Sequence, residues 1–153
     1  MKKSVYTLLQ WTWGLPQTLL GSAVYIANRK KRHFDYEGAC VTVWDRDDGM
    51  SLGKFIFVPK MGENEKTGNL IVSKELAEHE YGHTIQSLIL GPAYLLLVGA
   101  PSLIWSRIPY FENKRKKTGK SYYAPIFESS ANVLSAKRLQ KEDKDSSVKR
   151  SVK

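Results

Sequence analysis

The pentapeptide HEYGH, from His79 to His83, constrains this chain more than any other stretch, because it has the pattern HExxH. We predict a helix over residues 74–90, in which side chains four positions apart lie on one face. The two imidazoles would then project side by side and occupy two corners of a zinc tetrahedron. Glu80 would lie beside the metal as a general base for the water that the metal holds.

The apolar residues around the motif distinguish it from a chance pair of surface histidines. Between Glu78 and Arg107, the only Asp, Glu, Lys, Arg or His residues are His79, Glu80 and His83. Burying such groups without partners is costly, and a metal ion supplies the partner. A surface helix would instead carry solvated charges around its histidines. The sequence therefore favours a metal site.

A catalytic zinc ion usually has three protein ligands, so a third ligand is needed. The extended pattern HExxHxxGxxH is excluded, because Gln86 and Ile89 occupy the positions of its glycine and third histidine. Only Glu128 among the downstream acids lies in an apolar stretch predicted to be helical; the others are Glu112, Glu142, Asp143 and Asp145. We predict His79, His83 and Glu128 as the metal ligands. The alternative for Glu128 is a glutamate in a first helical turn, stabilised by the helix dipole.

Asn132 follows Glu128 by four positions and shares its face of the predicted helix. Its amide could accept a hydrogen bond from the outer nitrogen of a metal-bound histidine and so fix the tautomer of that ring. We predict this supporting role for Asn132, and the alternative is a polar residue that faces solvent.

The pattern His79-Glu80-x-x-His83 followed by Glu128-x-x-x-Asn132 resembles the gluzincin group of zinc metallopeptidases, which have HExxH and a downstream ExxxD. The chain has Asn132 in place of the Asp, and 44 residues lie between His83 and Glu128, more than in thermolysin-type enzymes. The resemblance covers the two helices only. The chain is also similar to small bacterial proteins with a QxxWxLPQxLLG start and HEYGHxxQS, which implies no function.

The gluzincin resemblance implies a minimal zincin-like domain that binds Zn²⁺ and hydrolyses a peptide or protein substrate. Glu80 would take a proton from zinc-held water and pass it to the leaving amine. A strand beside the motif helix would pair with extended substrate, and residues 55–58 are the candidate. The donor to the oxyanion stays open, with Tyr122, Tyr123 and Arg107 as the nearest residues.

Two other functions remain open at this point. The first is a non-catalytic, zinc-stabilised, membrane-associated protein; the second is an intramembrane protease, which the apolar stretches allow. Structural zinc sites normally have four protein ligands. No fourth His, Cys or well-placed carboxylate is evident, and Cys40 is the only cysteine. An open fourth position favours the peptidase.

The pattern of residues predicts a single α+β domain over residues 1–140 of the 153, followed by a disordered basic tail over 141–153. Ser73 is the expected N-cap of the motif helix. The other expected elements are an apolar helix at 5–28, a β-hairpin or small antiparallel sheet from strands 41–44 and 55–58, a loop at 60–69, a short strand at 70–72, a buried apolar helical hairpin or re-entrant element at 93–105, a basic loop at 107–121 and a last helix at 126–140.

Charge and hydropathy point to an anionic membrane surface as a partner. The net charge is +9, and basic clusters lie at 29–32 and 114–117, where a solvated loop is the alternative. No nucleic-acid-binding motif accompanies them, so nucleic acid is not expected. Residues 5–28 contain no charged residue. We expect a membrane-associated or core-packed helix there in the first place, a single membrane span in the second and a cleaved signal peptide last. The expected location is the cytoplasmic side of a membrane, and the alternative is a soluble cytoplasmic protein.

Overall fold

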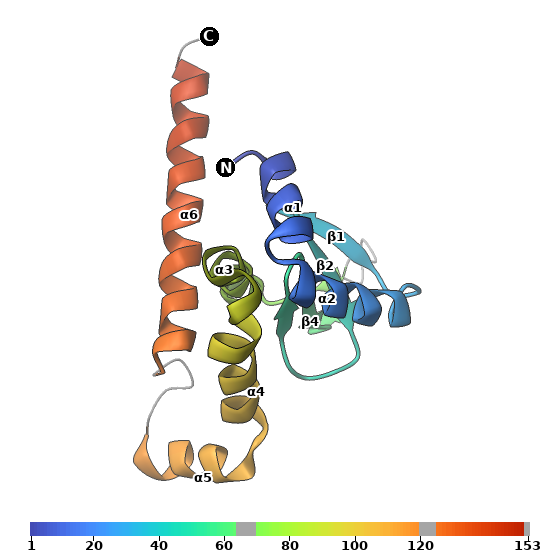
Figure 1. The fold of residues 1–153 in the computed structure, drawn as a ribbon, viewed down its shortest axis with the longest axis vertical. Helices are drawn as coiled ribbons and strands as arrows, with labels where there is room; N and C mark the ends of the chain where they lie inside the picture. Colours follow the sequence, from blue (N-terminus) through green and yellow to red (C-terminus); the bar gives the residue numbers. More distant parts are fainter. Residues whose placement is uncertain (64–69, 120–124, 152–153) are drawn as a thin grey trace.

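A computed structural model describes residues 1–63, 70–119 and 125–151 and shows an α+β chain with six α-helices and a small mixed sheet in these ranges (Figure 1). The elements are α1 (Lys3–Thr12), α2 (Leu15–Ala27), β1 (His33–Tyr36), β2 (Ala39–Trp44), β3 (Met50–Leu52), β4 (Phe55–Pro59), β5 (Gly62–Glu63), β6 (Leu70–Ile71), α3 (Lys74–Leu90), η1 (Gly91–Ala93), η2 (Leu95–Gly99), α4 (Ala100–Arg107), α5 (Pro109–Thr118) and α6 (Ile126–Ser151). The predicted α+β class is confirmed at this level.

The main sheet has the order β1-β2-β4-β3 and is mixed rather than antiparallel. The predicted hairpin of residues 41–44 and 55–58 is wrong, because β2 and β4 pair in parallel, with Cys40 opposite Phe55. The connection between them contains β3, which forms a hairpin of its own with β4 through a turn at Gly53, where φ is +58°. Strand β4 is therefore central, and β1 and β3 form the edges.

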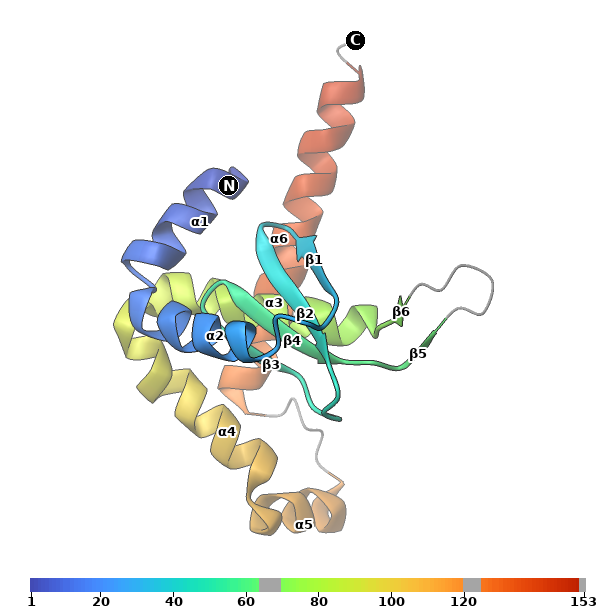
Figure 2. The same ribbon diagram turned by 90° about the vertical axis from the view of Figure 1, so that its right-hand side faces the viewer.

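A second, two-stranded sheet lies apart from the main one (Figure 2). The short strand predicted at 70–72 is present as β6, and it pairs antiparallel with β5, with Gly62 opposite Ile71. The predicted loop at 60–69 is thus a strand at residues 62–63, and its residues 64–69 lie outside the described part of the chain.

Helix α3 spans residues 74–90, as predicted, and Ser73 caps it by accepting a hydrogen bond from the Leu76 amide at 3.1 Å. Its buried apolar side, with Ala77 and Tyr81, packs on the sheet residues Val41, Val43, Ile56 and Val58. This packing leaves the opposite side of α3, which carries both motif histidines, to face α6.

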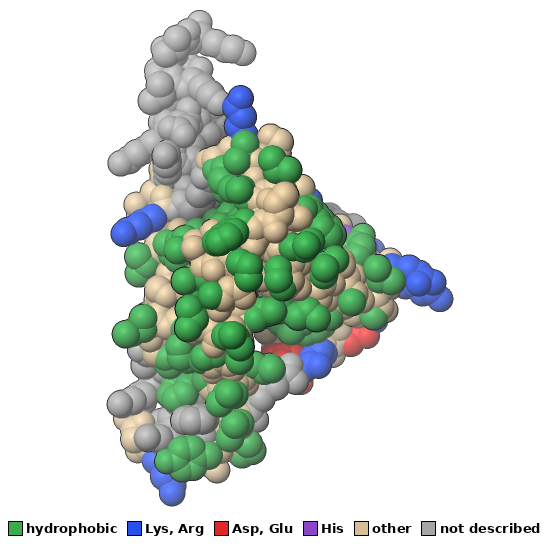
Figure 3. All heavy atoms as spheres, in the orientation of Figure 1, with side chains coloured by type: hydrophobic (Ala, Val, Ile, Leu, Met, Phe, Trp, Pro, Cys, Tyr) green, Lys and Arg blue, Asp and Glu red, His purple; other side chains and the backbone are tan. Residues whose placement is uncertain are grey.

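The apolar run 5–28 forms two helices, not one, because Pro16 lies in the first turn of α2 and the chain turns at residues 13–14. A single span over this run is therefore not formed. Helix α1 packs on α3, helix α2 packs on β3, β4 and η1, and Figure 3 shows that the face they share with α4 is largely hydrophobic. Among the residues that the structure describes, we find no helix with the length and apolar character needed to cross a membrane.

The helical hairpin expected at 93–105 is absent. Gly91, with φ of +54° against the ring of Trp13, ends α3; the chain turns there and then runs through η1, η2 and α4 in one direction (Figure 2). Many apolar side chains of this segment are exposed, such as Leu96 at 77%, so it is not a buried element.

The last segments are more helical than the sequence indicated. The basic stretch predicted as a loop at 107–121 forms α5 over residues 109–118, which begins at a proline. Helix α6 starts at residue 126, as predicted, and runs to residue 151, through the segment predicted to be disordered. That segment contains four Lys, one Arg and one Glu, which are good helix formers, and it lacks Gly and Pro, so its composition is compatible with a helix.

Candidate metal centre

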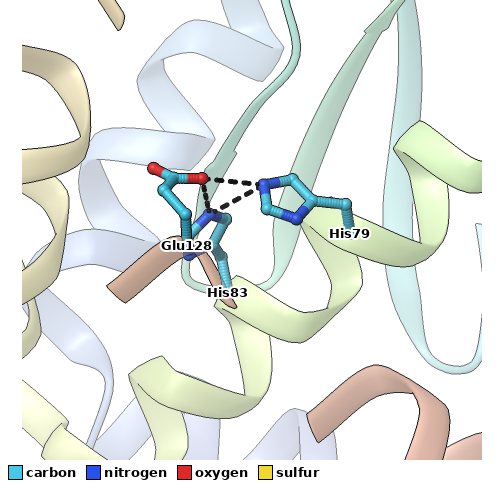
Figure 4. Close-up of side chains that lie close together, drawn as sticks. All are labelled: His79, His83 and Glu128. Carbon is cyan, nitrogen blue, oxygen red and sulfur yellow. Dashed lines mark hydrogen bonds and ion pairs between the residues drawn. The ribbon is translucent and has the colours of Figure 1, made fainter. Parts of the chain in front are cut away.

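His79, His83 and Glu128 converge on one point between α3 and α6 (Figure 4). The Nε2 atoms of the two histidines are 3.2 Å apart. Oε2 of Glu128 lies 3.0 Å from Nε2 of His79 and 3.5 Å from Nε2 of His83. All three side chains are buried, with exposures of 3%, 4% and 0%. The arrangement could hold a metal ion, and it contains the three ligands predicted from the sequence.

Gly82, the fourth residue of the motif, lets α6 reach this point. A Cβ atom placed on Gly82 would lie 2.0 Å from the carbonyl oxygen of Ala131, which is itself fully buried. The backbones of α3 and α6 are therefore in direct contact one turn from His79 and one turn from Glu128. The sequence analysis did not assign a role to Gly82, although a glycine inside a helix is a signal for such close packing.

The outer nitrogen of each histidine bonds to a side-chain amide. Nδ1 of His79 lies 2.9 Å from Oδ1 of Asn132, the position predicted for this residue. Nδ1 of His83 lies 2.6 Å from Oε1 of Gln86, a contact that the sequence analysis missed. The spacing of three residues between His83 and Gln86 on one helix was the available signal.

The orientation of the Gln86 amide follows from its other contacts. Its Nε2 donates to the carbonyl oxygen of Phe127 and to Oγ of Ser130, both at 2.7 Å, so Oε1 must face His83. An amide oxygen only accepts hydrogen bonds, so Nδ1 of His83 carries the proton. In the neutral ring Nε2 then presents a lone pair towards Glu128.

The same reasoning applies to His79 when the oxygen of Asn132 faces it. Two imidazole lone pairs and one carboxylate oxygen then point at one another. Oε2 of Glu128 is buried and has no hydrogen-bond donor, and its approach to His79 is an ion pair only if that ring is protonated. Such a cluster needs a positive charge at its centre, either a proton or a metal ion.

The charges of the cluster reinforce one another. Burial would raise the pKa of the Glu128 carboxyl, but in the metal-free cluster the imidazoles of His79 and His83, when they carry a proton at Nε2, and the hydroxyl of Ser102 outweigh it and lower that pKa to about 2. Burial would lower the pKa of His83, but Glu128 and Glu80 raise it above its ordinary value. Glu128 is therefore a carboxylate at neutral pH, as a metal ligand must be.

Glu80 lies beside the cluster on the wall of a cavity of about 400 Å³. Burial raises the pKa of its carboxyl, and the opposing effects of the two histidines are smaller. Gly49 borders it closely, since a Cβ on Gly49 would lie 2.4 Å from Oε1 of Glu80. The cavity is also lined by His83, by Tyr94 and by residues 50–52 of β3.

No protein-family model, curated protein or solved structure matches the chain. The function of the site therefore has to be inferred from its geometry.

Several other sequence-based candidates are not part of the described site. Tyr122 and Tyr123 lie outside the described residues, as do the side chains of Arg107 and Glu112. Residues 55–58 do not form an edge, because β4 lies between β2 and β3. Tyr94, 3% exposed and on the cavity wall, was missed, since in the sequence it is one aromatic residue in an apolar run.

Proposed function

We propose that the chain is a zinc-dependent metallopeptidase, in which His79, His83 and Glu128 bind the metal and Glu80 is the catalytic base. The observation that carries this proposal is the ligand triangle next to a cavity that contains a buried carboxylate with a raised pKa. Enzymes place groups with shifted pKa values at sites of proton transfer.

The dimensions of the cluster fit zinc. Zinc bonds of about 2.0–2.1 Å at tetrahedral angles hold ligand atoms about 3.3 Å apart. The three ligand atoms here are 3.0, 3.2 and 3.5 Å apart. Two nitrogens and one carboxylate oxygen are also the ligand set of several zinc peptidases, which leave the fourth position to water.

A bound zinc ion would supply Lewis acidity, polarising the scissile carbonyl and lowering the pKa of a water molecule at the site. Glu80 would take a proton from a water molecule at the site and deliver it to the leaving amine. A carboxyl with a raised pKa suits both steps, because it holds the proton between them. Asn132 and Gln86 keep the two imidazoles in the tautomer that leaves Nε2 free.

Tyr94 is the candidate donor to the developing oxyanion. Burial and the charge of Glu80 raise the pKa of its hydroxyl, so it remains protonated at neutral pH. Tyr94 lines the same cavity as Glu80 and His83. A hydrogen bond from Tyr94 to the reacting carbonyl oxygen would stabilise the charge that forms there.

Strand β3 replaces residues 55–58 as the candidate substrate-binding edge. It is an edge of the main sheet, and its residues 50–52 line the cavity. An extended peptide can add to such an edge through main-chain hydrogen bonds. This places the peptide across the wall that carries Glu80.

The test is a comparison of wild type, Glu80→Gln and Glu128→Gln. Wild type should bind one zinc ion per chain and cleave casein. Glu80→Gln should keep the zinc and lose cleavage by about 10²–10⁴-fold, because only the base is removed. Glu128→Gln should lose zinc. Wild type that takes up no zinc refutes the proposal, and wild type that holds zinc without cleaving casein favours the non-catalytic alternative.

A further inference from the structure

The first two helices bury polar side chains and expose many of their apolar ones. Gln10 and Gln17 are fully buried, whereas Leu8, Leu19 and Leu20 are exposed by 62%, 51% and 51%. A helix on a water-facing surface has the opposite arrangement, with its apolar stripe towards the core. The outward side of α1 and α2 is thus not adapted to water.

Specific hydrogen bonds hold this inverted arrangement in place. Gln10 donates to the carbonyl oxygen of Thr84 at 3.0 Å, and Gln17 donates to Oγ of Ser87 at 2.8 Å and to the carbonyl oxygen of Gly91 at 3.0 Å. These partners all belong to α3 or to the residue that ends it. Polar residues that interrupt the run 5–28 therefore help to dock it, together with the buried ring of Tyr6, while several of its leucines are left outside.

The hydrophobic surface continues beyond these helices. We define the apolar face as the exposed apolar side chains of α1, α2, η2 and α4. Figure 3 shows a surface that is mainly hydrophobic over these elements, and Figure 2 shows them along one side of the molecule, with β5 and β6 on the opposite side. Leu96 is 77% exposed, and Trp13 is 53% exposed. Contiguous apolar patches of this extent mark interaction sites.

Basic side chains predominate at the margins of the apolar face, where Figure 3 shows Lys and Arg at several edges of the view and Asp and Glu at the lower right. The exposed residues Lys2, Arg29 and Lys30 lie just outside the two ends of the α1–α2 segment. An apolar centre with a cationic rim matches a lipid leaflet with anionic headgroups.

We propose that the apolar face docks in the plane of an anionic lipid bilayer, with α1, α2 and α4 at the level of the headgroups and upper acyl chains. Tryptophans such as Trp13 favour this level of a membrane. A second copy of the chain is the poorer occupant, because two such faces would bring their cationic rims together in a protein of net charge +9.

Docking would also place the candidate site at the lipid surface. The cavity that contains Glu80 is lined at its apolar side by Leu20 and Leu103, which are 51% and 50% exposed. Its substrates would then be peptide segments close to a membrane, such as the stretch next to a lipid anchor. This step rests on the proposed function, whereas docking itself does not.

The first test is co-sedimentation of the full chain with vesicles of phosphatidylcholine alone or with phosphatidylglycerol. Wild type should bind the anionic vesicles. Leu8→Gln/Leu19→Gln/Leu96→Gln should bind about tenfold more weakly for each leucine. The matched control is Met61→Gln/Ile71→Gln, which changes residues 65% and 50% exposed on the opposite side and should bind like wild type.

Charge variants test the rim separately. Arg29→Gln/Lys30→Gln should weaken binding to anionic vesicles about fivefold per charge and reduce its sensitivity to salt. Lys74→Gln is the control, since Lys74 is exposed at the start of α3 near β6 and should have no effect.

Tryptophan fluorescence reports on the orientation. Lipids brominated in the upper acyl chain should quench wild type, and Trp13→Phe should remove much of that quenching. Trp44→Phe should retain it, because Trp44 is 4% exposed and lies in β2.

Three results would overturn docking: no binding by wild type, unchanged binding by the leucine variant, or a solution dimer that the leucine variant abolishes in the absence of vesicle binding. For the substrate step, casein coupled to a vesicle lipid should be cleaved faster than free casein. The leucine variant should cleave the coupled casein no faster than free casein, and its rate on free casein should equal that of wild type. Equal rates refute the substrate step, whereas cleavage of neither form refutes the peptidase and leaves the docking result standing.

Discussion

Replacing Gly82 by alanine should disable the metal centre without touching a ligand. The added Cβ would lie 2.0, 2.5 and 2.9 Å from the O, C and Cα atoms of Ala131, which are all backbone atoms. Real Cβ contacts are not shorter than 3.0 Å, so α3 and α6 must separate by 3.0 − 2.0 = 1.0 Å or more. Metal–ligand distances tolerate only about 0.2 Å.

This separation moves Glu128 away from the histidines by several times that tolerance. We expect zinc affinity to fall by more than the 10–100-fold that loss of an outer-shell contact typically causes. Overpacking should also destabilise the metal-free chain by about 1–3 kcal/mol, offset by up to about 1 kcal/mol from the better helix propensity of alanine.

The assay is zinc titration against a competing chelator, with thermal unfolding of the metal-free protein followed by circular dichroism. Gly99→Ala is the matched control, because a Cβ there meets nothing closer than 3.6 Å. If Gly82→Ala has the zinc affinity and the unfolding temperature of wild type, the position of α6 does not depend on backbone contact at Gly82. The account of the site would then be wrong.

Three further predictions follow from the same contacts. Asn132→Ala should weaken zinc binding by about 10–100-fold, and Asn132→Asp, which keeps an acceptor oxygen, should bind zinc nearly as well as wild type. If wild type and Asn132→Ala bind zinc with equal affinity, Asn132 does not support His79. The metal-free chain should be most stable towards the acid end of the range from about pH 4.5 to 6.5: the lowered pKa of Glu128, about 2, gives stability that is lost on acidification, and the raised pKa values of Glu80 and His83 give stability that is lost as the pH rises through them. Unfolding temperatures measured across pH with a chelator present check this, and a monotonic profile would contradict it. Gln17→Leu should destabilise the fold by about 1–3 kcal/mol in urea, because it leaves buried partners on α3 unsatisfied, while Leu19→Gln should change it by less than about 0.5 kcal/mol; the reverse order would mean that α2 is docked differently.

The residues that converge at the candidate site could be predicted because each has a local signature. The spacing within HExxH puts the histidines on one helical face, and Ser73 marks the start of that helix. Glu128 was identifiable as the one downstream acid in an apolar helical stretch, and Asn132 followed from it by helical periodicity. These inferences require only the repeat of a helix and the cost of burying charge.

The remaining features depend on contacts between distant segments. Strand β3 lies next to a stretch rich in turn-forming residues, so the sequence analysis did not predict it. Without β3, strands β2 and β4 were predicted to form an antiparallel hairpin, whereas they pair in parallel. Gln10 and Gln17 looked like interruptions of an apolar helix, although they are the residues that dock it on α3. Hydropathy alone does not say which side of a helix faces the core when the partner surface is itself polar.

The ligands also divide the chain in a way that bears on its evolution. His83 and Glu128 stand at the two ends of a 44-residue excursion that contains α4 and α5. An ion bound by both residues would hold the two ends of this segment together. The entropic cost of closing such a loop rises by only about 0.6 kcal/mol for each doubling of its length. The first part of the excursion contains Gln86, Tyr94 and Ser102, which contact or line the site, so only its later part, from α5 onwards, is free to lengthen or shorten while the coordination sphere stays intact.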